Sequence, residues 1–475
     1  MHYIDIIVLS LYFLIILWIG FFYFRKNKDT EAYYVGDRKM GSLHIGLSVV
    51  ATDVGGGFSI GLGGLGFMMG LSGSWMLFTG LMGAWLSATL LIPKIFDKSR
   101  LAKMLTFPQL LGSFYDKRVA LLAGLISGIG YLGFTSSQLL AGAKLATATF
   151  PVLSISEGLL IMGVIAVVYT TFGGLKAVIY TDTFQWAILI LGLSLVGIPA
   201  GYLAIGGWDA MSTMLPERFL SLGNISAVQA INWVITIVPI WFIGMTLYQR
   251  IYACRDLKTA KRAWYLAGLF EYPVMAFMGV LLGLFARVGA EQGLFEAVGY
   301  SSAAGMDPEL GLPLLLRNVL PIGVMGLLLA AYFSAIMSTA DSCLMAASGN
   351  VITDIFGLTE GRKVSQKSQM RVSQIVTLLL GSAAILLASQ MQNVLELMLY
   401  SYAFMVSGLF IPVLGFLFYR TPPRTAAFWS MLLGGTTTLS LTALPQALPW
   451  GLDPIFFGIV IGGLTFLLIR TFKKG

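Results

Sequence analysis

The chain has 475 residues and a formal net charge of +8, but only 11% of its residues are charged and 57% are apolar. Its mean hydropathy is +0.84, and a soluble domain carries about 25% charged residues. The composition therefore excludes a water-soluble protein, and two cysteines exclude a disulfide-rich one. Two histidines and no Cys/His cluster argue against transition-metal chemistry.

Apolar segments long enough to cross a bilayer, about 20 residues each, recur along the whole chain. We predict thirteen membrane-spanning helices, with a lipid bilayer as their surroundings. They lie near 3–24, 42–69, 73–95, 119–149, 157–171, 178–205, 228–249, 263–286, 320–354, 371–391, 394–419, 425–443 and 454–472. The first segment has its basic residues after it, so we expect an uncleaved helix.

The basic residues fall mainly on one side of this topology. If all thirteen segments span, most of the 30 Lys and Arg residues lie in alternate loops. We expect the protein to lie in the plasma membrane. The positive-inside rule then places the N-terminus outside the cell and the C-terminus in the cytoplasm. Arg250, just after the seventh segment, is counted with these inner charges. The asymmetry explains the net charge, so no nucleic-acid partner is expected.

The second segment is interrupted by the sequence ATDVGGG at 51–57, roughly at mid-membrane by helix rise. Consecutive glycines are poor helix formers, and Asp53 is costly at this depth. We interpret the run as an unwound helix that lines a site. Close packing of helices through small residues is the alternative. It fits the later glycines of the segment better than it fits the run containing Asp53.

The ninth segment carries four oxygen-bearing side chains within five residues, namely Ser338, Thr339, Asp341 and Ser342. Ser338, Asp341 and Ser342 share one helical face. Hard oxygen ligands of this kind suit Na⁺ better than a soft metal. Ser and Thr hydroxyls can instead bond to the carbonyl four residues earlier, but this does not explain an aspartate inside a span.

Two further segments carry unusual residues. The sixth opens with YTDT at 180–183, and its Asp182 is either a site residue or a helix N-cap near the interface. The seventh contains Pro239 and Gly244, which we predict to break the helix. Two interrupted helices at similar depth are typical of transporters with inverted repeats.

We therefore predict a single transmembrane domain over 1–475 with two five-helix repeats. The repeats span 41–205 and 228–419, preceded by the helix at 3–24 and followed by two helices within 425–472.

Three motifs make this chain similar to the sodium/solute symporter family, which includes sodium/proline, pantothenate, sialic-acid, sugar and choline transporters. They are ATDVGGG at 51–57, YTTFGG at 169–174 with YTDT at 180–183, and AIMSTADS at 335–342. The resemblance implies an all-α membrane protein with the LeuT-like five-plus-five inverted repeat. It also implies Na⁺ as the coupled ion and rules out an enzyme.

The resemblance implies a main sodium site made by the carbonyls of Ala51, Val54 and Ala335 and the hydroxyls of Ser338 and Thr339. It further implies a possible second sodium or coupling site. The residues of this second site are Asp182, Asp341, Ser342 and Asp53. Asp341 stands where some members have serine. Asp53 matches proline-type members, whereas choline-type members have tryptophan there.

The solute is expected to be small and polar, with an amino acid or a carboxylate favoured over a sugar, pantothenate or choline. Proton coupling remains the alternative to sodium coupling. Candidate solute contacts are Gly56, Phe58, Ser59, Gln138, Trp241, Thr246 and Tyr402. An ion channel, a membrane enzyme and a membrane sensor are less consistent with clustered midplane oxygens, two histidines and no appended output domain.

Overall fold

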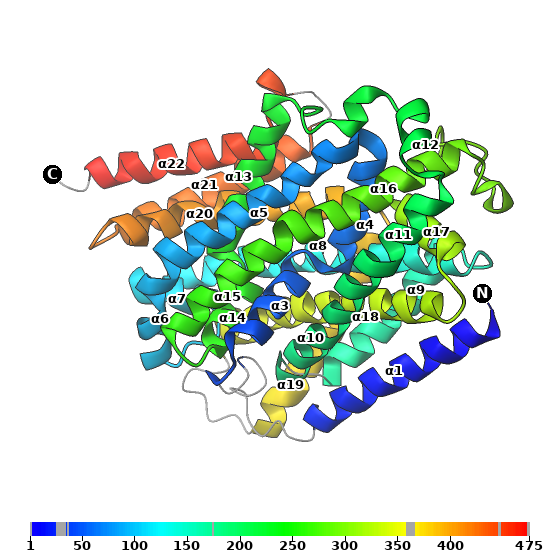
Figure 1. Cartoon of the computed structure of the whole chain (residues 1–475). Coiled ribbons are helices and arrows are strands. Elements are labelled where there is room, and N and C mark those ends of the chain that lie inside the picture. Colours follow the sequence, from blue (N-terminus) through cyan, green and yellow to red (C-terminus); the bar gives the residue numbers. More distant parts are fainter. Residues whose placement is uncertain are drawn as a thin grey trace.

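The computed structural model describes residues 2–24, 35, 38–172, 175–357, 366–444 and 448–472, and helices dominate it (Figure 1). A helical unit lies at each of the thirteen predicted positions. In chain order the units are α1 (Tyr3–Phe24); α3 (Ser42–Asp53) with α4 (Gly55–Met69); α5 (Trp75–Leu86) with α6 (Ile92–Leu101); α8 (Lys117–Thr149); α9 (Ile155–Phe172); α10 (Leu175–Gly192) with α11 (Ile198–Ala204); α13 (Ala227–Ile243) with α14 (Met245–Ala253); α15 (Leu257–Leu269) with α16 (Ala276–Glu291); α18 (Val324–Gly349); α19 (Gln366–Ala388); α20 (Val394–Phe418); α21 (Arg424–Thr442); and α22 (Pro454–Phe472). Shorter helices α7 (Phe107–Phe114), α12 (Gly207–Met214) and α17 (Pro308–Val319) connect them.

Length and apolar composition alone select fewer spans than thirteen. Within the described residues, eight helical stretches qualify, or nine if the bent pair α13–α14 is one span. The difference has three sources. Helices α4, η2 (Gly70–Ser74), α5 and α6 are joined in one stretch, α1 and α9 qualify only as shorter apolar helices, and α21 does not qualify.

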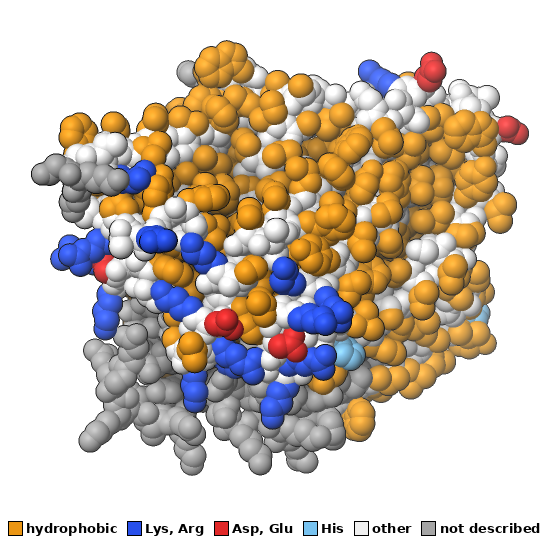
Figure 2. Space-filling view, turned by 60° about the vertical axis from the view of Figure 1, so that its left-hand side comes forward, with side chains coloured by type: hydrophobic (Ala, Val, Ile, Leu, Met, Phe, Trp, Pro, Cys, Tyr) orange, Lys and Arg blue, Asp and Glu red, His pale blue; other side chains and the backbone are white. Residues whose placement is uncertain are grey.

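The outer surface suits a bilayer over much of its area. On α9, Leu160, Val164 and Val168 are exposed at helical spacing, so this helix shows an apolar face to its surroundings. Figure 2 shows hydrophobic side chains covering most of the visible face, whereas Lys and Arg gather toward one end. That end carries α6 and the α14–α15 connection, where the Arg100 side chain donates to the Arg255 carbonyl.

Helix α8 is central to the packing. It contacts α18, α20, α9 and α19, while α3 packs against α15 and α10. Helix α1 lies against α18 and α10, and the hairpin α21–α22 packs on α20, so these extra helices occupy opposite flanks of the bundle (Figure 1). Most of α3 is thereby buried inside the bundle.

The two predicted interruptions are both present, and each is short. Helix α3 ends at Asp53 and α4 begins at Gly55, which has a φ of +56° that glycine adopts easily. Helix α13 ends at Ile243, and α14 follows Gly244 at an angle of 43°. The prediction that Pro239 also breaks this helix is wrong, because Pro239 lies inside α13. The single non-helical residue that produces the bend is Gly244.

Candidate functional site

Oxygen atoms from α3 and α18 meet where α3 ends. The Thr339 hydroxyl lies 2.9 Å from the carbonyl oxygen of Ala51 and 3.0 Å from that of Ala335. A hydroxyl carries one proton, so it can donate to only one of these oxygens at a time. Val54, the residue between α3 and α4, follows Ala51 by three residues and is fully buried. A Cβ on Gly55 would come within 3.0 Å of the Thr339 hydroxyl, so only glycine leaves this approach open.

A second cluster lies about one turn of α3 before Ala51 and is centred on Asp182 of α10. Its carboxylate accepts hydrogen bonds from Ser48 of α3, at 2.6 Å, and from Ser338 of α18. Asp182 is completely buried. Because Ser338 donates to Asp182 and Thr339 contacts Ala51, two adjacent α18 residues connect the two clusters.

Arg250 of α14 supplies the positive charge of this cluster. Its guanidinium lies 3.4 Å from the Asp182 carboxylate and 3.2 Å from the Ser342 hydroxyl, and it also donates to Thr52. Further bonds reach the Ser48 side chain at 3.0 Å and the Ser48 and Thr246 carbonyls. Placing Arg250 in an inner loop was wrong, because the residue is fully buried inside the bundle. The predicted span ended one residue too early to include it.

Asp341 has different surroundings from Asp182. The Thr170 hydroxyl of α9 donates to one oxygen of its carboxylate. The other oxygen has no hydrogen-bond partner among the described residues. Ser342 contacts Arg250. The residues of the predicted second site are therefore divided. Asp182 and Ser342 contact the Arg250 guanidinium, whereas Asp341 contacts Thr170 of α9.

Asp53, the last residue of α3, belongs to a third group. Its carboxyl interacts with Glu271 and with Tyr402. Glu271 is fully buried in η6 (Phe270–Met275), the distorted turn between α15 and α16. Sequence reasoning missed Glu271, although an ionisable residue inside the span at 263–286 was itself a signal of function.

The predicted solute contacts surround this third group. The Thr246 hydroxyl lies 3.0 Å from the hydroxyl of Tyr131, and the Tyr402 ring meets the Phe134 ring edge to face at 5.1 Å. Other predicted contacts lie near by: the Gln138 side-chain oxygen is 3.2 Å from a Cβ position on Gly55, Ser59 donates to the Gly55 carbonyl, and Trp241 is buried against α5. The surroundings of Gly56 and of the Phe58 side chain lie outside the described part of the structure. Tyr131 and Phe134 were not predicted, since buried aromatic residues are common in any core.

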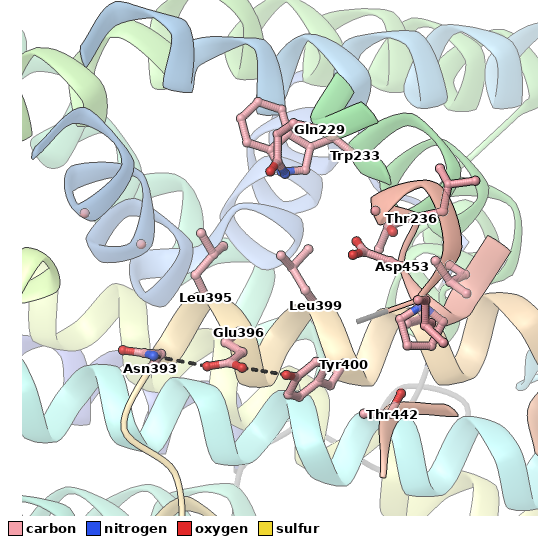
Figure 3. Close-up of a pocket in the computed structure, with 18 of the residues that line it drawn as sticks. Gln229, Trp233, Thr236, Asn393, Leu395, Glu396, Leu399, Tyr400, Thr442 and Asp453 are labelled. Carbon is pink, nitrogen blue, oxygen red and sulfur yellow. Dashed lines mark hydrogen bonds between the residues drawn. The ribbon is translucent and has the colours of Figure 1, made fainter. Parts of the chain in front are cut away.

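A separate pocket of about 630 Å³ is lined by residues of α4, α13 and α20 (Figure 3). Its acidic lining residues are Asp307, Glu309, Glu396 and Asp453, and none of its lining residues is Lys, Arg or His. Glu396 accepts hydrogen bonds from Tyr400 at 2.5 Å and Asn393 at 3.1 Å. Partial burial raises the pKa of Asp453 above its ordinary value. The pocket reaches Ala403, the neighbour of Tyr402.

Two sequence relatives are matched along almost their whole length. The osmoregulated proline transporter OpuE of Bacillus subtilis is 27% identical over 487 residues, covering 99% of this chain and 95% of the relative. The sodium/proline symporter of Escherichia coli is 25% identical over 473 residues, covering 96% and 90%.

Two solved structures share the fold. A Na⁺-coupled sialic acid symporter superposes with a TM-score of 0.79 at 20% identity, covering 98% of this chain and 96% of that one. The nucleobase-cation-symport-1 transporter Mhp1 gives 0.57 at 16% identity, with 93% and 94% covered. These likenesses confirm the predicted all-helical, LeuT-like membrane fold. The sequence profile of the Sodium:solute symporter family matches residues 33–434, so this chain belongs to that family of sodium-coupled transporters.

Proposed function

We propose that this chain imports a small organic solute, an amino acid or a carboxylate, together with Na⁺ by alternating access. The observation that carries the proposal is the meeting of Thr339 with the carbonyls of Ala51 and Ala335 where α3 is interrupted. With Ser338 and the carbonyl of Val54, this gives five hard oxygen ligands from two helices, the ligand type that Na⁺ prefers.

Sodium in this position bridges α3 and α18. Binding from outside therefore favours the conformation in which the two helices are close, and release inside frees them. The membrane potential adds about 2.3 kcal/mol per charge for each 100 mV. The solute binds beside the α3–α4 break, where the positive N-terminal end of α4 attracts a carboxylate.

The sodium count follows from Arg250. Its guanidinium contacts both Asp182 and Ser342, two of the residues expected to form a second sodium site. We propose that this fixed positive charge replaces the second ion and that one Na⁺ is carried per cycle. Sodium and an arginine side chain would otherwise compete for the same carboxylate.

We also propose an outer N-terminus and a cytoplasmic C-terminus. The exposed basic residues of α6 and the α14–α15 connection support this orientation, since the Arg100 side chain contacts the Arg255 carbonyl and Lys and Arg gather toward one end of the visible face (Figure 2). Other residues of the expected inner set, including Arg25 and Arg362, lie outside the described residues. In this orientation the acidic pocket opens to the outside.

A thermal-shift experiment on purified protein tests the sodium site. A ligand stabilises by RT ln(1 + [L]/Kd), so Na⁺ should raise Tm whereas K⁺ should not. Thr339→Ala should abolish the Na⁺ effect. Thr149→Ala is the matched control, because Thr149 is equally buried and bonds to its own helix at Leu145. A Na⁺ shift that survives in Thr339→Ala, or no shift in the unmodified protein, would overturn the site.

A further inference from the structure

Asp53 and Glu271 place two carboxyl groups side by side in the interior. The Asp53 carboxyl interacts with Glu271, and α3, which ends at Asp53, contacts η6, which carries Glu271. Neither oxygen of Glu271 makes a hydrogen bond of good geometry with the described residues. Within the described part of the chain, the buried ion pairs involve Lys144 and Arg250, and neither reaches this pair. Two adjacent carboxyl groups without a counter-charge are costly.

Helix α5 lies directly against Glu271 of this pair. Gly80 faces the Glu271 carboxylate and Gly83, one turn further, faces the Trp241 ring, with no room for a Cβ in either place. The carboxylate and the indole therefore lie against one glycine face of α5. The Glu271 side chain is thus held by backbone contact and not by a polar partner.

Other polar groups near the pair also lack partners. The Tyr402 hydroxyl, which interacts with Asp53, and the Trp241 ring N–H make no hydrogen bond among the described residues. Both side chains are at least nine-tenths buried, and Phe134 packs edge to face on Tyr402. Buried donors and acceptors without partners mark a place where a ligand completes the hydrogen bonding. Aromatic rings beside carboxylates also suit a cation.

A pocket that reaches Ala403, the chain neighbour of Tyr402, is also lined by acidic but no basic side chains. Lys144 neutralises Asp307 and Glu309 from behind this lining, whereas the hydrogen-bond partners of Glu396 are neutral. A cleft lined by one sign of charge concentrates ligands of the opposite sign. Free anions are therefore disfavoured in this pocket.

We infer that Asp53 and Glu271 bind the ammonium group of the transported solute, with Tyr402 beside it. This inference rests on the proposed function and narrows it, because a carboxylate without an ammonium group would meet two like charges. The N-terminal end of α4, which begins at Gly55 two residues after Asp53, attracts a carboxylate. The two ends of the α3–α4 break therefore match the two charges of an amino acid. Sodium has its own oxygen ligands at Thr339, on α18.

The test uses matched probes on the purified full chain in saturating Na⁺. Each set contains an amino acid, its amine and its carboxylate: proline, pyrrolidine and cyclopentanecarboxylate; leucine, isopentylamine and 4-methylpentanoate; lysine, cadaverine and hexanoate. Thermal shift gives the affinity of each probe. We expect at least one ammonium-bearing probe to raise Tm and its carboxylate partner to have no effect.

Glu271→Gln should weaken binding of that probe by about tenfold or more, because it removes a charged hydrogen-bond acceptor. The shift caused by Na⁺ alone should persist. Glu217→Gln, an exposed residue far along the chain, is the matched control and should change neither. If Glu271→Gln does not fold, Tyr402→Phe and the comparison of probes on the unmodified protein still decide.

Several results would overturn the inference. These are a carboxylate that binds as well as its amino acid, no shift with any ammonium-bearing probe, or unchanged affinity in Glu271→Gln. Loss of the Na⁺ shift in Glu271→Gln would also overturn it and assign the pair to sodium. Failure of the proposed function looks different, since Na⁺ would then have no effect on the unmodified protein.

Discussion

The guanidinium of Arg250 lies 3.4 Å from the carboxylate of Asp182, and neither side chain reaches solvent. Arg250 comes from α14, in the second repeat, and Asp182 from α10, in the first. The same guanidinium also reaches Ser48 and Thr52 on α3 and Ser342 on α18. One side chain therefore joins the inner halves of both interrupted helices, α3 and α14, to α10 and α18.

Removing this arginine should destabilise the protein strongly. Arg250→Met leaves the Asp182 carboxylate buried without its counter-charge, which costs about 3–5 kcal/mol. We expect a lower Tm in Na⁺-free detergent solution, with partial recovery in the double variant Arg250→Met/Asp182→Leu. Arg255→Met is the control, since the pair of Arg255 with Asp256 is more than half exposed and should contribute little. Equal Tm values for the two single variants would contradict this.

Several parts of this arrangement could be predicted from the sequence because they break a strong pattern. Glycines after Asp53 and hydroxyls around Thr339 stand out in apolar segments, so the interruption at Val54 and the oxygen cluster on α18 were both foreseen. Helix positions were also foreseen, because apolar length is a robust signal.

Contacts between distant segments could not be predicted in the same way. Arg250 resembles any basic residue at the end of a span, and only the packing of α14 against α3 shows that it is buried. Pro239 resembles a helix breaker, but α13 accommodates it and bends at Gly244. The pairing of Asp53 with Glu271 joins residues more than two hundred positions apart. A single sequence does not show which distant residues come into contact.

Sodium dependence should be non-cooperative if Arg250 replaces a second ion. We expect solute uptake into proteoliposomes to rise with Na⁺ concentration along a simple hyperbola, with a Hill coefficient near one. The charge moved per solute, measured by electrophysiology on the same liposomes, should fit one sodium. A Hill coefficient near two, with correspondingly more charge, would show that a second ion binds despite the arginine.

Replacing Gly55 with alanine should impair sodium binding specifically. The backbone of Gly55 has a φ of +56°, which costs a residue with a side chain about 1–2 kcal/mol. A Cβ there would also approach the Thr339 hydroxyl to 3.0 Å and the Gln138 oxygen to 3.2 Å. We expect a weaker Na⁺-induced shift in Tm. Gly41→Ala is the control, because a Cβ at Gly41 meets no atom within 4 Å. Identical Na⁺ titrations of the two variants would contradict the role of Gly55.

Lys144 should be essential for the stability of the opposite end of the bundle. Its ammonium group on α8 lies 2.6 Å from Asp307 and 2.6 Å from Glu309, and the side chain is 1% exposed. Glu309 in turn accepts hydrogen bonds from the backbone amides of Val394 and Leu395 at the start of α20. The lysine thus neutralises a carboxylate that connects α17 to α20.

Lys144→Met should therefore lower Tm markedly, since it leaves Glu309 buried and charged without its counter-charge. Lys144→Met/Glu309→Gln should be more stable than Lys144→Met, because glutamine is neutral and its carbonyl can still accept a bond from an α20 amide. Circular dichroism melts of the three proteins in one detergent measure the order. If the double variant were the less stable, the positive charge of Lys144 would not be what Glu309 requires, and the contacts of α17 with α20 would have to be stabilised by packing instead.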